Sequence, residues 1–183
     1  MRAGLASCLA SAIALRAARD GANIVIAAKS AEAHPKLPGT IHTVAAEVEA
    51  AGGKALALQL DVRDEVAVQV AMARAAEHFG GIDALVNNAG AIKLVGVEKL
   101  EPKRFDLMYQ INTRAVMVCS QAALPYLKKS AGGHVLNLSP PLNLDAKWFA
   151  QHGPYTVTKY GMSMLTLGMS EEFKKYGISV NSL

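Results

Sequence analysis

Residues 9–28 read LASAIALRAARDGANIVIAA, and this stretch decides the fold. Apolar side chains recur at helical spacing up to Gly21, where a helix is expected to end. Arg16 and Arg19 fall in the last turn, where the helix dipole favours basic side chains. The β-branched run at 23–28 is typical of a parallel strand covered on both faces. A helix, a glycine and a buried strand make half of a βαβ unit.

The rest of the chain repeats this alternation of helix and strand. A proline-containing loop, HPKLPG at 34–39, leads into the next helix. Further helices are expected at 41–51, 64–80, 102–129 and 155–176, and further strands at 54–60, 84–86, 134–138 and 178–182. Such alternation predicts a parallel sheet with right-handed crossovers and helices on both faces. The fold class is therefore α/β, with a Rossmann-like doubly wound parallel sheet.

Composition excludes several classes of protein. With 183 residues, about half of them apolar, the chain fits one domain, residues 1–183. The net charge of +4 comes from interspersed signs, which favours a solvated surface over a nucleic-acid patch. Charges recur too often for an apolar run of roughly 18 residues, so no membrane span is expected. Cys8 and Cys119 lie far apart with no metal-spaced partner, so we expect neither a disulfide framework nor a metal site.

The first residues allow a second interpretation. They are rich in Arg, Ala and Ser and contain no acid before Asp20, which is also the composition of an organellar transit peptide. Their apolar middle resembles a short secretory segment. The helical spacing continues without a break to Gly21, and this continuity favours a helix of the fold.

Ligands of doubly wound sheets bind outside the carboxyl ends of the strands. That rule directs attention to Lys29, Asp61, residues 87–90 and Ser139. Lys29 follows the strand at 23–28, where a cation favours the 2′-phosphate of NADP over the bare hydroxyl of NAD. The alternative is that Lys29 is one more solvated lysine at a loop entrance. Asp61 could accept from an adenine amino group or only cap the next turn.

The strongest chemical pattern is Tyr155-Thr-Val-Thr-Lys159. On a helix, residues i and i+4 share a face, so the phenol and the ammonium are neighbours. A nearby cation favours the phenolate and lowers the tyrosine pKa from its ordinary value of about 10. Such a tyrosine serves as a general acid or base. Tyr-x-x-x-Lys also occurs by chance in many helices, but this pair opens the helix that follows the strand at 134–138.

Four motifs in order carry a family resemblance. They are NNAG at 87–90, Asn112 within QINTRAV, LNLS at 136–139 and YTVTK at 155–159. Together they resemble the short-chain dehydrogenase/reductase family, and segments such as GANIVIAAKS and KYGMSM resemble its hydroxysteroid dehydrogenase-like branch. The resemblance runs from about residue 10 to the last residue.

The resemblance implies catalytic roles for three residues. Tyr155 would be the proton donor or acceptor at the substrate carbonyl or alcohol. Lys159 would lower the pKa of Tyr155 and hold the nicotinamide ribose, and Asn112 would sustain a water in a proton relay. Without the family, Asn112 reads as a helix-surface amide.

The resemblance also implies the cofactor contacts, with NADP expected and NAD less favoured. Asp61 and Val62 would contact the adenine, and Asn87 the cofactor ribose. Gly90 would let the backbone approach the cofactor closely. Without the family, Asn87 and its neighbour read as a turn.

The sequence departs from the family's pattern first at the catalytic serine. Where members commonly have Ser-Ser, this chain has Ser139-Pro140, and proline offers no donor. Ser139 points to the opposite face of the strand, so it would replace the missing hydroxyl only if the Pro-Pro bend re-aims it. Asn143 is another possible donor. The loop that follows is apolar, with Leu142, Trp148 and Phe149, which favours an apolar alcohol, aldehyde or ketone as substrate; core packing of the two aromatic rings is the alternative.

The chain ends are the second departure. Family domains begin with a strand and a glycine loop of the form T-G-x-x-x-G-I-G, whereas residues 4–10 here read GLASCLA. We expect the sheet to lack this first strand and the C-terminal strand, which makes the domain incomplete. The first strand would lie centrally, so its absence would leave backbone groups unpaired at about 1–3 kcal/mol each.

Two functions follow as hypotheses. One is an NADP-dependent oxidoreductase acting on a small apolar substrate. The other is a truncated chain that binds cofactor weakly and acts through a full-length partner. Self-association into a homo-oligomer is expected for either, without nucleic acid or membrane. The expected compartment is the cytoplasm, with the peroxisome or mitochondrion as alternatives.

Overall fold

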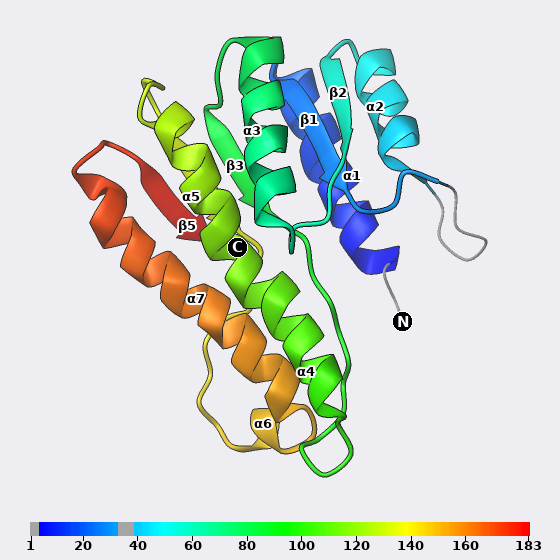
Figure 1. Cartoon of the computed structure of the whole chain (residues 1–183), viewed down its shortest axis with the longest axis vertical. Coiled ribbons are helices and arrows are strands. Elements are labelled where there is room, and N and C mark those ends of the chain that lie inside the picture. The colour runs from blue at the N-terminus through cyan, green and yellow to red at the C-terminus, as the bar shows by residue number, and fades with distance from the viewer. Residues whose placement is uncertain (1–3, 33–38) are drawn as a thin grey trace. The chain divides into compact units, whose positions relative to one another are not determined.

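The computed structural model describes residues 4–32 and 39–183 (Figure 1). These residues divide into two compact units, one ending at Gly80 and one beginning at Gly81. Each unit is α/β, as the alternating pattern predicts. The HPKLPG loop, apart from Gly39, lies outside the described residues. The single domain expected from chain length remains a prediction.

The first unit contains two parallel strands and three helices. Its elements are α1 (Gly4–Arg19), β1 (Asn23–Ala28), α2 (Ile41–Ala50), β2 (Lys54–Gln59) and α3 (Glu65–Phe79). Residues 4–10, which stand in place of a glycine loop, form the first turns of α1. Capping residues fix the later helices: Thr40 forms a capping box at α2, and the Asp64 carboxylate accepts from the Ala67 amide at 3.0 Å.

The core of the first unit lies where α1 and α2 cover the strands. Val48 is fully buried against Ala14 and Ala18, with Ile24 and Ile26 of β1 packed beside them. Gly53 allows the chain to turn tightly here, because an added Cβ would lie 2.8 Å from the Cβ of Ala18. Ile41 and Val48 of α2 are buried, as their helical spacing predicts, whereas α1 buries Ala14 and Ala18 and leaves Leu9 43% exposed.

The second unit contains three parallel strands and the longest helix. Its elements are β3 (Ala84–Asn87), α4 (Pro102–Tyr109), η1 (Gln110–Arg114), α5 (Ala115–Leu127), β4 (His134–Asn137), α6 (Lys147–Ala150), α7 (Gly153–Lys174) and β5 (Ser179–Ser182). The green α4–α5 rod and the orange α7 run side by side (Figure 1). Buried Leu127, Val135 and Met162 belong to the core between helices and strands.

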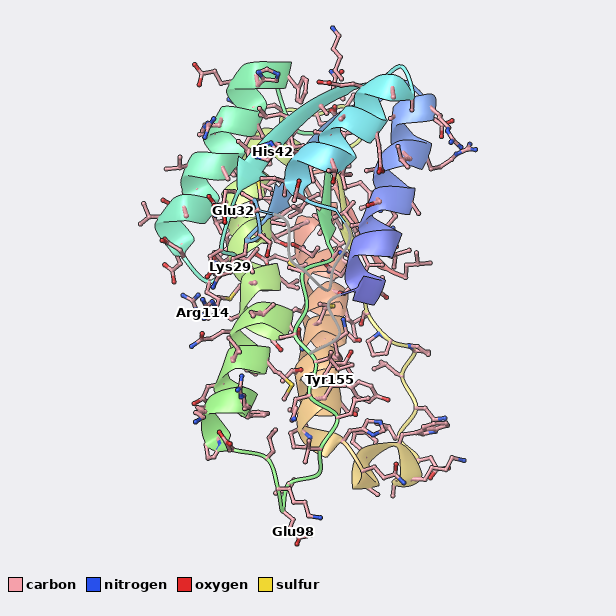
Figure 2. The ribbon with its side chains drawn as sticks, turned by 90° about the vertical axis from the view of Figure 1, so that its right-hand side faces the viewer. Lys29, Glu32, His42, Glu98, Arg114 and Tyr155 are labelled. Carbon is pink, nitrogen blue, oxygen red and sulfur yellow. The ribbon has the colours of Figure 1, made fainter. Side chains whose placement is uncertain are left out.

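Two expected elements differ from the structure. The helix expected at 102–129 is interrupted by η1, a π-helical turn, because one extra residue is accommodated there; such turns often occur at functional sites. The helix expected from Tyr155 begins two residues earlier, at Gly153, and the short helix α6 precedes it. Figure 2 shows Glu98 at the outer tip of the loop between β3 and α4.

The strand pairing agrees with a doubly wound order. β1 pairs with β2, with Asn23 opposite Lys54, and β3–β4–β5 form a second parallel sheet. These neighbours are the ones that the order 3-2-1-4-5-6 gives when its first strand is left out. Among the described residues, β1 pairs only with β2 and β3 only with β4, so these residues form two separate parallel sheets.

Candidate functional site

Tyr155 and Lys159 lie one turn apart at the start of α7. Pro154, within the first two positions of the helix, has the fixed φ that a helix start prefers. The Lys159 ammonium donates to the Leu138 carbonyl at 2.5 Å, which ties the helix to the carboxyl end of β4. Both side chains are half-buried, and Figure 2 labels Tyr155 on α7. The pair predicted from the sequence therefore stands at the carboxyl edge of this sheet.

The electrostatics of this pair differ from the sequence expectation. Burial raises the pKa of Tyr155 above its ordinary value, and burial lowers the pKa of Lys159. The expectation that Lys159 lowers the pKa of Tyr155 does not hold for this conformation. Desolvation dominates at Tyr155, and the ammonium is hydrogen-bonded to the Leu138 carbonyl. A phenol with a raised pKa stays protonated at neutral pH and has a proton to donate.

Asn112 connects the π-helical turn to the helix that carries Tyr155. Its amide nitrogen donates to the Ala91 carbonyl at 2.8 Å and to the Thr158 hydroxyl at 2.9 Å, and its oxygen accepts from the Ala91 amide at 2.7 Å. The Thr158 hydroxyl donates to the Tyr155 carbonyl at 2.8 Å. Asn112 is fully buried, so the helix-surface interpretation is wrong. Its role in a water relay remains a prediction.

Asn87 belongs to a buried polar network. Its amide donates to the Asn137 oxygen at 2.8 Å, and the Asn137 amide donates to the Thr166 hydroxyl at 2.8 Å. The network joins β3, β4 and α7, so Asn87 orients the strand ends. Its contact with a cofactor ribose remains a prediction. Gly90 is exposed, with an added Cβ 3.5 Å from the Asn112 side-chain oxygen.

The segment with Pro140 in place of a serine is held by α7. Ser139 is buried, and its hydroxyl bonds to the hydroxyl of Ser163. The Ser139 side chain therefore points toward α7. Its hydroxyl is bonded to Ser163. The Asn143 side-chain oxygen accepts from the Asp145 amide at 2.9 Å.

The loop and α6 that follow expose apolar side chains. Leu142 is 53%, Leu144 83% and Trp148 49% exposed. Phe149 packs edge-on against Tyr160, with ring centroids 5.4 Å apart. Core packing therefore does not describe Trp148, whereas Phe149 is in part a packing residue. The exposed apolar surface stands between the end of β4 and Tyr155 along the chain.

The second group of predicted residues lies in the first unit. The Asp61 carboxylate, after β2, accepts from the Arg63 guanidinium at 2.5 Å and pairs with the Lys29 ammonium at 3.1 Å. The Arg63 hydrogen bonds hold the pKa of Asp61 well below its usual range. The Arg63 amide also donates to Asp61, so the turn-capping interpretation is correct for this carboxylate. Val62 is half-buried beside it, and the adenine contacts remain a prediction.

Four residues of the site were not predicted from the sequence. Arg63, Thr158, Tyr160 and Ser163 each contact a predicted residue or the loop beside it. Ser163 stands four residues after Lys159, and Arg63 two residues after Asp61. Helix and turn spacing could therefore have indicated these two residues. Spacing could not have indicated Tyr160, because its partner Asn143 lies 17 residues away in the chain.

Two further findings concern the described part of the chain. Across residues 4–32 and 39–183, no three His, Cys, Asp or Glu side chains gather in a way that could hold a metal ion. In the same residues, none of the helices combines the length and apolar character needed to cross a membrane.

Comparison with known proteins defines the class. Residues 3–183 match the family described as short chain dehydrogenase. The chain belongs to the short-chain dehydrogenase family, whose fold and motif order agree with the sheet and with the Tyr155–Lys159 pair.

Within that family the chain is most informatively compared with four proteins. It is 60% identical to hydroxysteroid dehydrogenase-like protein 2 of Bos taurus over 96% of this chain and 42% of that protein, and 58% identical to the Homo sapiens protein of that name over the same shares. A solved putative dehydrogenase from Xanthomonas campestris is 55% identical, with a TM-score of 0.90 over 94% of this chain and 64% of that one. A metagenomic short-chain oxidoreductase in complex with NADP is 25% identical, with a TM-score of 0.83 over 94% and 74%. The chain thus spans about two fifths of the length of these curated relatives.

Proposed function

We propose that this chain transfers a hydride between NADP(H) and an apolar alcohol, aldehyde or ketone, with Tyr155 as the proton donor or acceptor. One observation carries the proposal: Tyr155 and Lys159 stand one turn apart on α7, and the Lys159 ammonium is hydrogen-bonded at the carboxyl end of β4. A phenol and an ammonium one helical turn apart at that edge of the sheet suit proton transfer to a substrate oxygen. Membership of the short-chain dehydrogenase family supports the same reaction class.

Tyr155 handles the proton in this proposal. The nicotinamide cofactor supplies the hydride when it is bound. Because the pKa of Tyr155 is raised, the phenol is ready to donate its proton to a substrate carbonyl oxygen at neutral pH. Alcohol oxidation needs the phenolate instead, so its rate should increase as the pH rises, whereas carbonyl reduction should not need high pH.

Lys159 and Asn112 support Tyr155 in different ways. To hold the nicotinamide ribose, Lys159 would exchange its hydrogen bond with the Leu138 carbonyl for one with the ribose. Asn112 reaches Tyr155 through Thr158, whose hydroxyl bonds to the Tyr155 carbonyl, so it fixes the first turn of α7. Asn87 would contact the ribose, and Gly90, which is exposed, would let the protein backbone approach the cofactor closely.

The first unit has donors that fit the phosphate end of NADP. Lys29 is 69% exposed along its side chain, and its ion pair with Asp61 is the kind of surface pair worth about 0–1 kcal/mol. A 2′-phosphate can therefore replace Asp61 as the partner of Lys29 at little cost. Asp61 and Val62 would then border the adenine. The NADP bound to the metagenomic relative supports NADP over NAD.

A cofactor titration tests this choice. NADPH and NADH are titrated separately into the chain and into Lys29→Ala, with cofactor fluorescence as the signal. We expect Lys29→Ala to weaken NADPH about tenfold, the equivalent of about 1.4 kcal/mol, and to leave NADH unchanged. Lys54→Ala is the matched control, because Lys54 stands at the opposite, amino end of β2. Equal weakening of both cofactors by Lys29→Ala would contradict a phosphate contact.

A second function has one observation in its favour. The parallel sheet of the described residues is in two pieces, and the residues proposed for adenine and for nicotinamide belong to different units. A chain of this kind could bind cofactor weakly and act through a full-length partner. Saturable micromolar NADPH binding by the purified chain would exclude this alternative.

Homo-oligomer formation is part of the proposal. Helices α5 and α7 expose apolar side chains, among them Met117, Val157, Met164 and Leu167. Light scattering across a range of chain concentrations tests the oligomer. Subcellular fractionation tests the proposed cytoplasmic location against the peroxisome and mitochondrion.

A further inference from the structure

Tyr160 connects the middle of the apolar loop to the helix that carries Tyr155. Its hydroxyl accepts from the Asn143 amide at 2.9 Å and donates to the Asn143 carbonyl at 2.8 Å. One side-chain oxygen thus satisfies both backbone groups of a single loop residue. Tyr160 directly follows Lys159 in α7, so the loop is attached next to the proposed catalytic pair.

The rest of the loop adds few ties to the fold. Residues 139–146 form no regular secondary structure. Pro140 and Pro141 have no amide hydrogen to donate. The side-chain oxygens of Asn143 and Asp145 accept from amides two residues further on, and Asp145 also pairs with the Lys147 ammonium at 2.9 Å. These local bonds shape the loop without anchoring it to α7. The anchors to α7 are Lys159 and Ser163 at the loop's start and Tyr160 at its middle.

The ring of Tyr160 holds the other end of the segment. Phe149 of α6 meets it edge-on at 5.4 Å between ring centroids, in the geometry that aromatic pairs prefer. The neighbouring Trp148 and the loop residues Leu142 and Leu144 expose their apolar side chains. One residue of α7 therefore fixes both the loop and the helix that present this apolar surface.

We infer that Tyr160 is a specificity-determining positioning residue: it fixes the apolar loop 139–146 and so sets the affinity for the apolar part of the substrate. This inference rests on the proposed function for its substrate class. The loop leaves β4 and returns through α6 to the first turn of α7, which carries Tyr155. In this inference, a substrate with its oxygen at Tyr155 lays its apolar part against the segment. A loop held in one position offers a preformed apolar wall, whereas a free loop must be ordered when the substrate binds.

Tyr160→Phe separates the hydroxyl from the ring. Phenylalanine keeps the packing on Phe149 and removes both hydrogen bonds to Asn143. Because Asn143 is exposed, water can satisfy its backbone groups, so the fold should survive. Tyr109→Phe is the matched control: Tyr109 is 46% exposed on α4 and packs on Phe105 at 6.2 Å between ring centroids.

The first readout is independent of catalysis. Hydrogen exchange at the Asn143 amide should be about tenfold faster in Tyr160→Phe than in the parent chain. Trp148 is the sole tryptophan, and its emission should be quenched more strongly by acrylamide. Unchanged exchange at Asn143 would overturn the inference, whether or not the chain proves to be an oxidoreductase.

The second readout concerns the substrate. With decanal and butanal, Tyr160→Phe should raise the KM for decanal about threefold to tenfold, with kcat and the dissociation constant of NADPH within twofold. Its preference for decanal over butanal should fall. A chain without turnover would contradict the proposed function, and the inference would then be decided by 1-decanol binding, followed by Trp148 emission. Faster exchange at Asn143 with unchanged affinity for decanal or 1-decanol would overturn the specificity role.

Discussion

Gly161→Ala probes the contact that holds Tyr155's helix against the π-helical turn. An added Cβ at Gly161 would lie 2.8 Å from the Thr113 methyl and 3.1 Å from its hydroxyl. Thr113 is buried, and its hydroxyl donates to the Thr158 carbonyl at 2.6 Å. Neither atom can move away freely, so either the helices separate or Thr113 rotates and loses its hydrogen bond.

The expected change in the free energy of unfolding is the sum of three contributions. Overpacking a filled core costs about 1–3 kcal/mol. The lost hydrogen bond costs about 1 kcal/mol, which is offset by the gain of about 1 kcal/mol from alanine over glycine in a helix. We expect Gly161→Ala to lower the free energy of unfolding by about 1–3 kcal/mol. Urea unfolding followed by circular dichroism measures it.

Gly168→Ala is the matched control on the same helix. Its added Cβ meets nothing within 4 Å, so the helix propensity should raise stability by up to about 1 kcal/mol. Thr113→Ser removes the methyl that the new Cβ would strike, and it should recover part of the loss in a double-mutant cycle. If Gly161→Ala is as stable as Gly168→Ala, or if Thr113→Ser gives no recovery, the proposed close contact is refuted.

Three other perturbations test the polar and acidic groups. Asn137→Ala removes the 2.8 Å acceptor of the Asn87 amide and leaves it only the Ser120 hydroxyl at 3.5 Å, whereas the Thr166 hydroxyl still donates to the Met162 carbonyl. The poorly satisfied amide should cost about 1–3 kcal/mol in urea unfolding, and stability equal to the parent chain would argue against the buried network. The folded-state pKa of Asp61 lies below its ordinary value of 3.8, so its carboxylate stabilises the fold above that pH and this contribution is lost as the pH falls. Asp61→Asn should therefore narrow the difference in unfolding free energy between about pH 5 and about pH 3, and an unchanged difference would contradict the pairing with Arg63. Burial raises the pKa of Cys119 from 9.0 to about 11, so its thiolate population is about 100-fold lower in the native chain. Peptide-resolved alkylation should be correspondingly slower in the native than in the urea-unfolded chain, and equal rates would show that Cys119 is accessible.

The elements of the fold were predictable because hydrophobic spacing and local signals agree. Gly21 and Gly80 adopt positive φ at the helix ends where the sequence puts them, and Asp64 caps its helix as expected. The π-helical turn was not predictable, because the spacing of apolar residues around QINTR is the same as in an ordinary α-helix.

The candidate site was predictable in its residues and less so in its contacts. Spacing indicated Tyr155 and Lys159, and the family resemblance indicated Asn112; all three lie in the second unit near the end of β4 or the turn that faces α7. The direction in which the pKa of Tyr155 shifts depends on how deeply the phenol is buried, and residue spacing does not determine burial. The double hydrogen bond of Tyr160 depends on the path of an irregular loop, which the sequence does not specify.

Turnover of NADPH with decanal tests the central proposal most directly. The chain and Tyr155→Phe are compared, with the loss of NADPH fluorescence as the signal and Tyr109→Phe as the control. A general acid contributes about 10²–10⁴ in rate, so Tyr155→Phe should lose at least about 100-fold in kcat while the dissociation constant of NADPH stays unchanged. Oxidation of NADPH by Tyr155→Phe at the parent rate would contradict the assignment of Tyr155 as the proton donor.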